Sequence, residues 1–143
     1  MMKSSGTINR EQVEQFCIEA MVRCGMSKEN ARIGAEVLVT TDMWGVYSHG
    51  TRALRQYLKR MRAGGLKAMA VPHIVKEGPA FAVMDADNAL AMVSACEAIK
   101  HAIAKAKETG IGFVTVFNSC HFGAAGYYAN MAARQGMIGI AMS

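Results

Sequence analysis

The sequence GFVTVF at residues 112–117 is rich in β-branched and aromatic side chains, a composition that predicts a buried β-strand. An alanine-rich, amphipathic segment precedes it, residues 89–107, and predicts a helix that ends at Gly110. Further upstream, the apolar run from Phe81 to Met84 predicts a second strand, which leads through a turn at residues 85–88 into a helix cap. A strand, a helix and another strand in this order favour an α/β layer with parallel pairing.

The same alternation continues after the central strand. Residues 123–135 predict a helix with Gly136 just past its end, and residues 137–142 predict a further buried strand. Three strands alone make a small layer that usually needs more sheet beside it. We therefore expect an α/β domain that is truncated at Ser143.

The first seventy residues predict a small helical unit. Apolar side chains recur there at three- and four-residue spacing, and Asn9 and Ser27 stand where helix N-caps are expected. Three helices follow from this pattern, over about residues 9–25, 27–43 and 51–62. We divide the chain accordingly into a helical N-terminal segment, residues 1–70, and a partial α/β domain, residues 71–143.

The composition is typical of a globular protein, because 52% of the 143 residues are hydrophobic and 19% are charged. The net charge of +5 raises the alternative of a basic nucleic-acid-binding protein. The positive charge concentrates in one helical stretch, however, and such a run is usually a solvated helix face. An anionic substrate or a cofactor phosphate would explain the excess equally well, so we expect no nucleic acid among the partners. The basic side chains of the stretch are Arg52, Arg55, Lys59, Arg60, Arg62 and Lys67.

Neither a leader nor a membrane span is expected from the sequence. Residues 1–10 are polar and lack the apolar run of a signal peptide, and no apolar stretch is long enough to span a bilayer. The four cysteines form no CxxC pair, and Cys17 and Cys24 lie seven residues apart on an apolar helix pattern that favours reduced core residues. We expect a cytoplasmic protein without a membrane partner.

The first candidate for chemistry lies at a break between helices, residues 42–50, where Ser48 and His49 stand between two glycines. Histidine suits proton transfer near neutral pH, and an adjacent hydroxyl can orient the ring or bind a substrate oxygen. A histidine that only satisfies a loop carbonyl would produce the same pattern. The spacing alone leaves both interpretations open.

The second candidate is the polar run Asn-Ser-Cys-His at residues 118–121, where the central strand leads into the next helix. Ligands favour the carboxyl end of a strand in an α/β layer, and a helix N-terminus offers free N–H groups to an anion. The small residues Gly123, Ala124 and Ala125 would let a ligand approach closely, although tight packing of helix on sheet would also explain them. The polar run favours a functional His121.

Other ligand motifs are absent from the sequence. His73 follows a proline in an expected linker and His101 lies in a helix rich in alanine and lysine, so both are expected at the surface. Four scattered histidines have no metal-ligand spacing, and we expect no metal site. No GxGxxG or P-loop motif indicates a standard phosphate site.

The two histidine segments, in this order and separation, carry a family resemblance. Ser48-His49-Gly50, followed by Arg52 and Tyr57, resembles the SHG segment of the malate/L-lactate dehydrogenase family. Residues 118–128 are similar to its glycine-rich segment with a histidine, and residues 85–88 match the turn between the two. The resemblance runs over nearly all of the chain and covers less than half of a full-length member.

This resemblance implies NAD- or NADP-dependent hydride transfer between a nicotinamide and a small 2-hydroxy or 2-oxo acid. It implies a non-Rossmann mixed α/β nucleotide-binding domain, which agrees with the missing fingerprint, and a homodimer. By the same resemblance Ser48, His49 and His121 are catalytic, with both histidines as acid/base candidates. The residues that would bind the cofactor are His121, Gly123, Ala124 and Ala125.

The chain departs from the family pattern at one position. Many members carry an arginine four residues after the SHG histidine, suited to a bidentate grip on a carboxylate, whereas this chain has Ala53 there. Arg52 and Arg55 flank that position, and either one is a candidate to bind the substrate. An inactive truncated fragment or an interaction module of the same family remains the main alternative.

Overall fold

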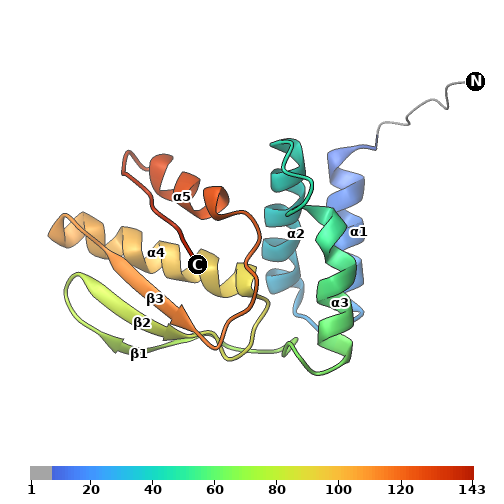
Figure 1. The fold of residues 1–143 in the computed structure, drawn as a ribbon, viewed down its shortest axis with the longest axis horizontal. Coiled ribbons are helices and arrows are strands. Elements are labelled where there is room, and N and C mark those ends of the chain that lie inside the picture. The colour runs from blue at the N-terminus through green and yellow to red at the C-terminus, as the bar shows by residue number, and fades with distance from the viewer. Residues whose placement is uncertain (1–7) are drawn as a thin grey trace, which may run out of the picture.

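The computed structural model describes residues 8–143, so most of the polar segment at residues 1–10, where no signal peptide is expected, lies outside the described residues. A group of helices stands beside an α/β unit (Figure 1). The helical group consists of α1 (Arg10–Val22), α2 (Lys28–Met43), the short 3₁₀ helix η1 (Thr51–Ala53) and α3 (Leu54–Arg62). The third predicted helix is therefore divided, because its first turn is a 3₁₀ turn.

Both predicted N-caps of the first two helices are confirmed. The side chain of Asn9 accepts a hydrogen bond from the backbone N–H of Glu11 at 2.8 Å, and Ser27 Oγ accepts one from the N–H of Asn30 at 3.1 Å. These contacts satisfy backbone donors that have no partner within the first turn of a helix. The short side chains before each apolar pattern thus define where the helices begin.

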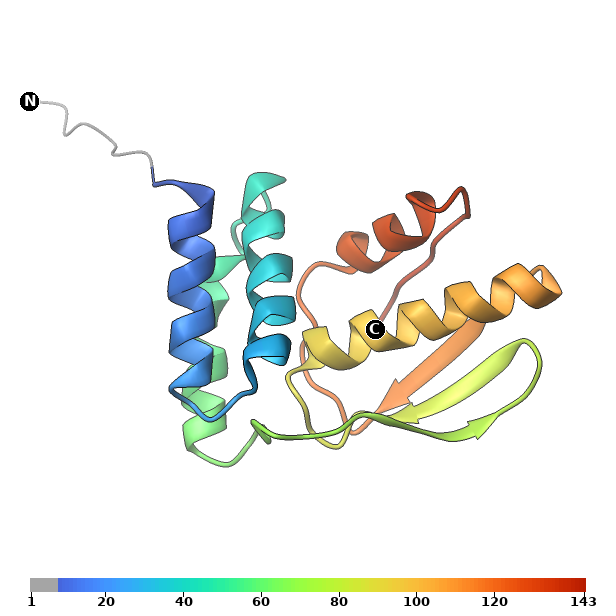
Figure 2. The same ribbon diagram turned by 180° about the vertical axis from the view of Figure 1, so that it is seen from behind.

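The sheet has three strands within the described residues, in the spatial order β1-β2-β3. β2 (Phe81–Asp85) pairs with β3 (Phe113–Phe117) in parallel, with Phe81 opposite Phe113 and Asp85 opposite Phe117. The connection between them is α4 (Ala91–Thr109), which covers one face of the sheet, while α5 (Ala125–Ala133) lies over α4 (Figures 1 and 2). The predicted α/β class with parallel pairing is confirmed.

β1 (His73–Glu77) was not predicted from the sequence, which indicated a linker there. It pairs with β2 in the antiparallel sense, and the register shifts between Ile74 and Lys76. Most of its side chains are exposed, so it lacks the alternation of apolar and polar residues that marks a half-buried strand. The sheet is consequently mixed.

The predicted strand at residues 137–142 is wrong, because this segment pairs with no strand in the described part of the chain. Apolar and small residues alternate here as in a half-buried strand. Ile138 is 94% exposed and Ile140 is 72% exposed, however, so the apolar side of the segment is not buried. A Cβ on Gly139 would lie 2.3 Å from the carbonyl oxygen of Ala129, which places the segment against α5 instead of β3. The expected side-chain cap after the turn at 85–88 is also wrong, since the residue before α4, Leu90, makes no capping hydrogen bond with its side chain.

One buried cluster joins the helical group to the α/β unit. It includes Met21 of α1, Leu38 of α2, Tyr57 of α3 and Met92 of α4, each at most 3% exposed. The boundary predicted at residue 70 falls between α3 and β1, and the division into two units remains a prediction. No helix among residues 8–143 combines the length and the apolar character needed to cross a membrane.

Candidate active site

The loop that carries Ser48 and His49 is closed by Asp42, near the C-terminus of α2, which binds Thr51 at the other end of the loop. Asp42 Oδ2 accepts hydrogen bonds from the backbone N–H of Thr51 at 3.0 Å and from the Thr51 hydroxyl at 2.5 Å. Hydrogen bonds to an ionised acceptor are stronger than neutral ones. The carboxylate therefore joins the end of α2 to the start of η1 and closes the loop between them.

Within this loop, Ser48 Oγ lies 2.8 Å from His49 Nδ1. Ser48 is exposed and His49 is half-buried, so the pair faces the surface without being covered. A hydroxyl can donate to the ring nitrogen or accept from it, and this contact therefore permits either neutral tautomer of His49. The other ring nitrogen, Nε2, makes no side-chain hydrogen bond within residues 8–143.

The loop that carries His121 begins where β3 ends. Asn118 has a φ of 49°, in the left-handed region that asparagine tolerates better than most side chains, and its Nδ2 donates to both carboxylate oxygens of Asp85 at 3.1 and 3.2 Å. Asp85 ends the neighbouring parallel strand β2. The loop therefore leaves the sheet at the carboxyl ends of both strands, the edge where ligands collect in α/β layers.

Tyr57 on α3 contacts the ring of His121, although the two residues are far apart in the sequence. The Tyr57 hydroxyl lies 2.7 Å from His121 Nδ1, and Tyr57 itself is only 3% exposed. The backbone N–H of Gly123 donates to the same ring nitrogen at 3.4 Å. The sequence gave no sign that Tyr57 contacts His121, because the two residues are far apart along the chain.

The two predicted histidines lie together. The ring centroids of His49 and His121 are 5.2 Å apart, and the ring planes are tilted by 33°. Partial burial, and then the charge of His49, lower the pKa of His121 below its usual range. Burial, and then Cys120, raise the pKa of Tyr57 to about 12, so its hydroxyl stays protonated near neutral pH.

The small residues expected to face a cofactor have mixed environments. Gly123 is buried with a φ of +80°, and a Cβ there would make ordinary contacts with Met92, Val37 and His49 at 3.7–3.8 Å. Residue 123 therefore favours glycine for its left-handed backbone and not for lack of space. Ala124 and Ala125 are half-buried where α5 begins, and no side chain caps that helix. These helix N–H groups suit an anionic group of a nucleotide.

The candidate arginines project away from the core. Arg52 in η1 and Arg55 in α3 are both exposed, and neither forms an ion pair with another described residue. Ala53 between them packs against the core as a partly buried residue. Both guanidinium groups are thus free of ion pairs within residues 8–143.

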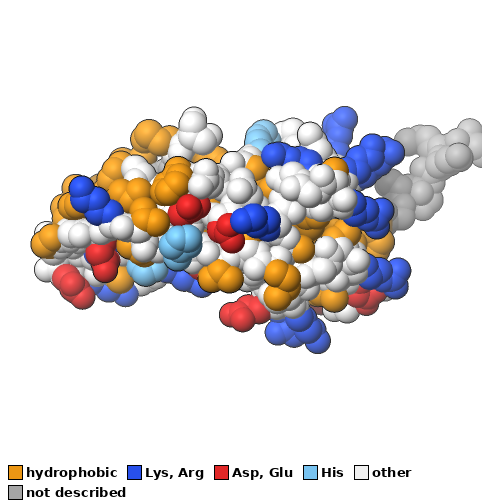
Figure 3. Space-filling model, turned by 90° about the horizontal axis from the view of Figure 1, so that it is seen from below, with side chains coloured by type: hydrophobic (Ala, Val, Ile, Leu, Met, Phe, Trp, Pro, Cys, Tyr) orange, Lys and Arg blue, Asp and Glu red, His pale blue; other side chains and the backbone are white. Residues whose placement is uncertain are grey.

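The remaining histidines lie apart from this pair. His73 starts β1 and His101 lies on α4, and both are exposed as predicted. Within residues 8–143 no group of three His, Cys, Asp or Glu side chains is arranged to hold a metal ion. Basic side chains are densest at the helical end of the face seen in Figure 3, while apolar side chains gather toward the opposite end.

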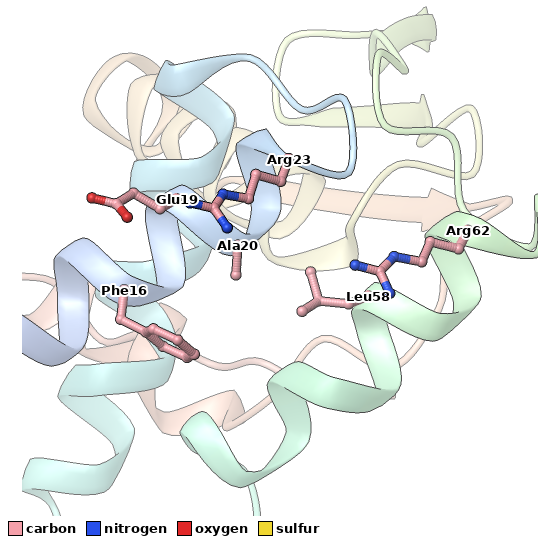
Figure 4. A pocket seen from close by; sticks show the side chains of 6 residues that line it. All are labelled: Phe16, Glu19, Ala20, Arg23, Leu58 and Arg62. Atoms are coloured by element: carbon pink, nitrogen blue, oxygen red, sulfur yellow. The ribbon is translucent and has the colours of Figure 1, made fainter.

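A surface pocket of about 300 Å³ lies between α1 and α3. Phe16, Ala20 and Leu58 form its apolar lining, and the guanidinium groups of Arg23 and Arg62 stand over it (Figure 4). None of its lining residues belongs to the histidine pair or to the loops that carry it. The pocket is therefore separate from the candidate active site.

Comparisons with known proteins agree on one family. The sequence profile of the family described as malate/L-lactate dehydrogenase matches residues 8–143. Malate dehydrogenase of Pyrococcus abyssi is 40% identical over 136 residues, which are 95% of this chain and 38% of the relative. Ureidoglycolate dehydrogenase (NAD(+)) of Escherichia coli K12 is 36% identical over 135 residues, which are 94% of this chain and 39% of the relative.

The solved structures give the same result for the fold. The structure of malate dehydrogenase from Pyrococcus horikoshii matches with a TM-score of 0.88 at 39% identity, covering 90% of this chain and 37% of that one. The chain thus spans about two fifths of the length of the relatives it matches, 38% for the Pyrococcus abyssi protein.

Proposed function

The chain belongs to the malate/L-lactate dehydrogenase family, and we propose that it carries the acid/base part of an oxidoreductase acting on small 2-hydroxy and 2-oxo acids. Because it spans 38% of the Pyrococcus abyssi relative, the activity of a whole enzyme is part of this proposal. The observation that carries the proposal is the pair of imidazole rings, His49 and His121, 5.2 Å apart at the carboxyl end of the sheet.

Two imidazoles at this distance suit a carbonyl group that becomes an alcohol. In the reducing direction, the C2 carbonyl oxygen of a 2-oxo acid gains negative charge and must take up a proton. One histidine can give that proton while the other donates a hydrogen bond to the same oxygen, and the oxidation of a 2-hydroxy acid runs through the same groups in reverse. Ser48 is proposed to orient His49 through the contact to its Nδ1.

The cofactor in this proposal is NAD or NADP, whose nicotinamide supplies or accepts the hydride when bound. The residues proposed to hold it are His121, Gly123, Ala124 and Ala125. The uncapped start of α5 supports this assignment, since its N–H groups suit a cofactor phosphate. The name of the Escherichia coli relative, ureidoglycolate dehydrogenase (NAD(+)), also supports a nicotinamide cofactor.

The substrate carboxylate is proposed to bind Arg52 or Arg55. Both are exposed, and both lie on the short stretch that follows His49, so a carboxylate held there would bring C2 of a small acid toward the ring. Arginine suits this role because its planar donors match a carboxylate. Malate and ureidoglycolate, the acids in the names of two relatives, are 2-hydroxy acids of this size.

A homodimer is part of the same proposal. Large apolar side chains stay exposed on β3 and on the segment after α5, including Phe113 at 61% and Ile138 at 94%. A surface with several large exposed apolar side chains supports an interface with another protein surface.

The experiment that tests the proposal follows oxidation of NADH and NADPH by the chain with a panel of 2-oxo acids that includes oxaloacetate and pyruvate. His49→Gln and His121→Gln should each lower kcat by about 10²- to 10⁴-fold, the usual contribution of a positioned acid or base. His101→Gln, an exposed histidine on α4, is the control and should match the unmodified chain. Oxidation that is equally fast in all four proteins would contradict the proposal.

A further inference from the structure

The two histidines differ in what their Nδ1 atoms contact. Near His49 Nδ1 stands the Ser48 hydroxyl at 2.8 Å, a group that can donate or accept. Near His121 Nδ1 stand the Tyr57 hydroxyl at 2.7 Å and the backbone N–H of Gly123 at 3.4 Å. A backbone N–H can only donate, so the two rings are not equivalent.

The longer Gly123 contact indicates which ring nitrogen of His121 lacks the proton, and the shorter Tyr57 contact holds the ring in that form. Nδ1 can accept from Gly123 only while it carries no proton of its own, and the neutral ring then bears its proton on Nε2. The Tyr57 hydroxyl must donate to the same atom, because an unprotonated nitrogen has nothing to give it. The alternative acceptor for that hydroxyl, the His121 carbonyl oxygen at 3.5 Å, is the more distant one.

We infer that Tyr57 is a positioning residue that fixes His121 with its proton on Nε2. In this form His121 donates a hydrogen bond to the substrate oxygen, and His49 is the group that exchanges a proton with it. The inference rests on the proposed function and ranks the two histidines, which the sequence left unranked.

The burial of Tyr57 supports this assignment. With 3% of its surface exposed, the side chain is held by the core of the helical group, so the hydroxyl has little freedom to turn away from the ring. Its raised pKa keeps the proton on the oxygen near neutral pH. The lowered pKa of His121 keeps that ring neutral, as a hydrogen-bond donor that is not a proton source must be.

The division of roles gives a balanced reduction step. A bound reduced nicotinamide would supply the hydride for the new C–H bond at C2 as its own C–H bond breaks, and the π pair of the carbonyl would move onto the oxygen. That oxygen would take a proton from the His49 imidazolium, which becomes neutral. His121 keeps its Nε2 proton throughout and only stabilises the charge that develops on the oxygen. Oxidation of the hydroxy acid returns the proton to neutral His49.

The test is ¹⁵N NMR of the histidine rings in the chain without substrate or cofactor, above the pKa of His121. The ring resonances of His121 are identified by their loss in His121→Gln. We expect the proton on Nε2 in the unmodified chain, and a substantial population with the proton on Nδ1 in Tyr57→Phe. Tyr128→Phe is the matched control, since it removes a buried hydroxyl that donates to the carbonyl of Phe122 in the same loop, and it should leave the tautomer unchanged.

A proton on Nδ1 of His121 in the unmodified chain overturns the inference, and so does a Tyr57→Phe spectrum identical to it. In turnover, Tyr57→Phe should lower kcat by about 10- to 100-fold with little change in KM, the range expected when a functional histidine loses an orienting partner. Because the spectrum is read without substrate, a chain that turns over no 2-oxo acid contradicts the proposed function, while the tautomer is decided separately.

Discussion

The carboxylate of Asp42 occupies the space that a side chain at residue 50 would need: a Cβ on Gly50 would lie 1.8 Å from Asp42 Oδ1. The same carboxylate holds Thr51 through two hydrogen bonds. The glycine that follows His49 is therefore required by packing and not by its backbone angle, since its φ is −92°. The third residue of the SHG segment, Gly50, is therefore a glycine because the Asp42 carboxylate leaves no room for a side chain.

Gly50→Ala should destabilise the chain by about 1–3 kcal/mol, the usual cost of forcing extra atoms into a packed site. The new methyl group would push Asp42 away from Thr51 and loosen the loop that carries His49. Urea denaturation followed by circular dichroism measures the change in the free energy of unfolding. Gly65→Ala is the control, because a Cβ there would meet only ordinary contacts, the nearest at 3.5 Å.

The origin of this cost can be isolated with a double variant. In an Asp42→Ala background the clash is gone, so Gly50→Ala should cost clearly less than it does in the unmodified chain. Equal costs in both backgrounds would show that the carboxylate does not limit the space at residue 50.

Acidification should destabilise the unmodified chain more than His121→Gln. Partial burial and the charge of His49 lower the folded-state pKa of His121 below its ordinary value of 6.5. The unfolded chain then binds this proton more readily, so the stability contributed by neutral His121 is present above the unfolded pKa and is lost as the pH falls through the folded pKa.

The titrating groups that face His121 are His49 from the loop after α2, Tyr57 from α3 and Cys120 beside it. Free energies of unfolding between about pH 8 and about pH 5 measure the effect, with His101→Gln as the control for an exposed histidine. If the unmodified chain and His121→Gln lose stability in parallel, His121 has no lowered pKa.

One of the two arginines after His49 should be needed for carboxylate binding. Replacing it by glutamine removes charge-assisted hydrogen bonds worth about 1.5–3 kcal/mol, which raises KM for a 2-oxo acid by about 10- to 100-fold. Steady-state kinetics of Arg52→Gln and Arg55→Gln, with Lys59→Gln as the control, separate the candidates. Three similar KM values would place the carboxylate elsewhere.

The fold was largely predictable where side-chain burial follows a simple period. Cys17 and Met21 are buried one helical turn apart on α1, and the caps Asn9 and Ser27 lie where local hydrogen bonding requires them. The parallel pairing of β2 and β3 followed from the strand-helix-strand order. These features depend on neighbours in the sequence or on general rules of chain connection.

The errors arose where exposure and local pattern disagree. β1 exposes most of its side chains, so no apolar face marked it as a strand. The segment after α5 has the apolar alternation of a strand, yet Ile138 and Ile140 are exposed. A period in the sequence shows which residues could share a face, and only the tertiary structure decides whether that face is covered.

The candidate site was predictable in its residue types but not in its geometry. His49 and His121 were identified separately, each from the polar run around it, and the structure brings their rings together. The contact between Tyr57 and His121 was missed because nothing in the sequence relates a buried face of α3 to a loop after β3. That contact is long-range, so no local pattern in the sequence could indicate it.

The most direct test of a nicotinamide-dependent enzyme is the thermal stability of the chain with millimolar NADH or NADPH, in the unmodified protein and in His121→Gln. A ligand at about 100 times its Kd adds roughly 2.7 kcal/mol, which raises Tm by several degrees. We expect such an increase with one of the two cofactors and its loss or marked reduction in His121→Gln, while adenosine alone has little effect. The same Tm with and without both cofactors would contradict a nicotinamide site in this chain and would favour an inactive segment of the family.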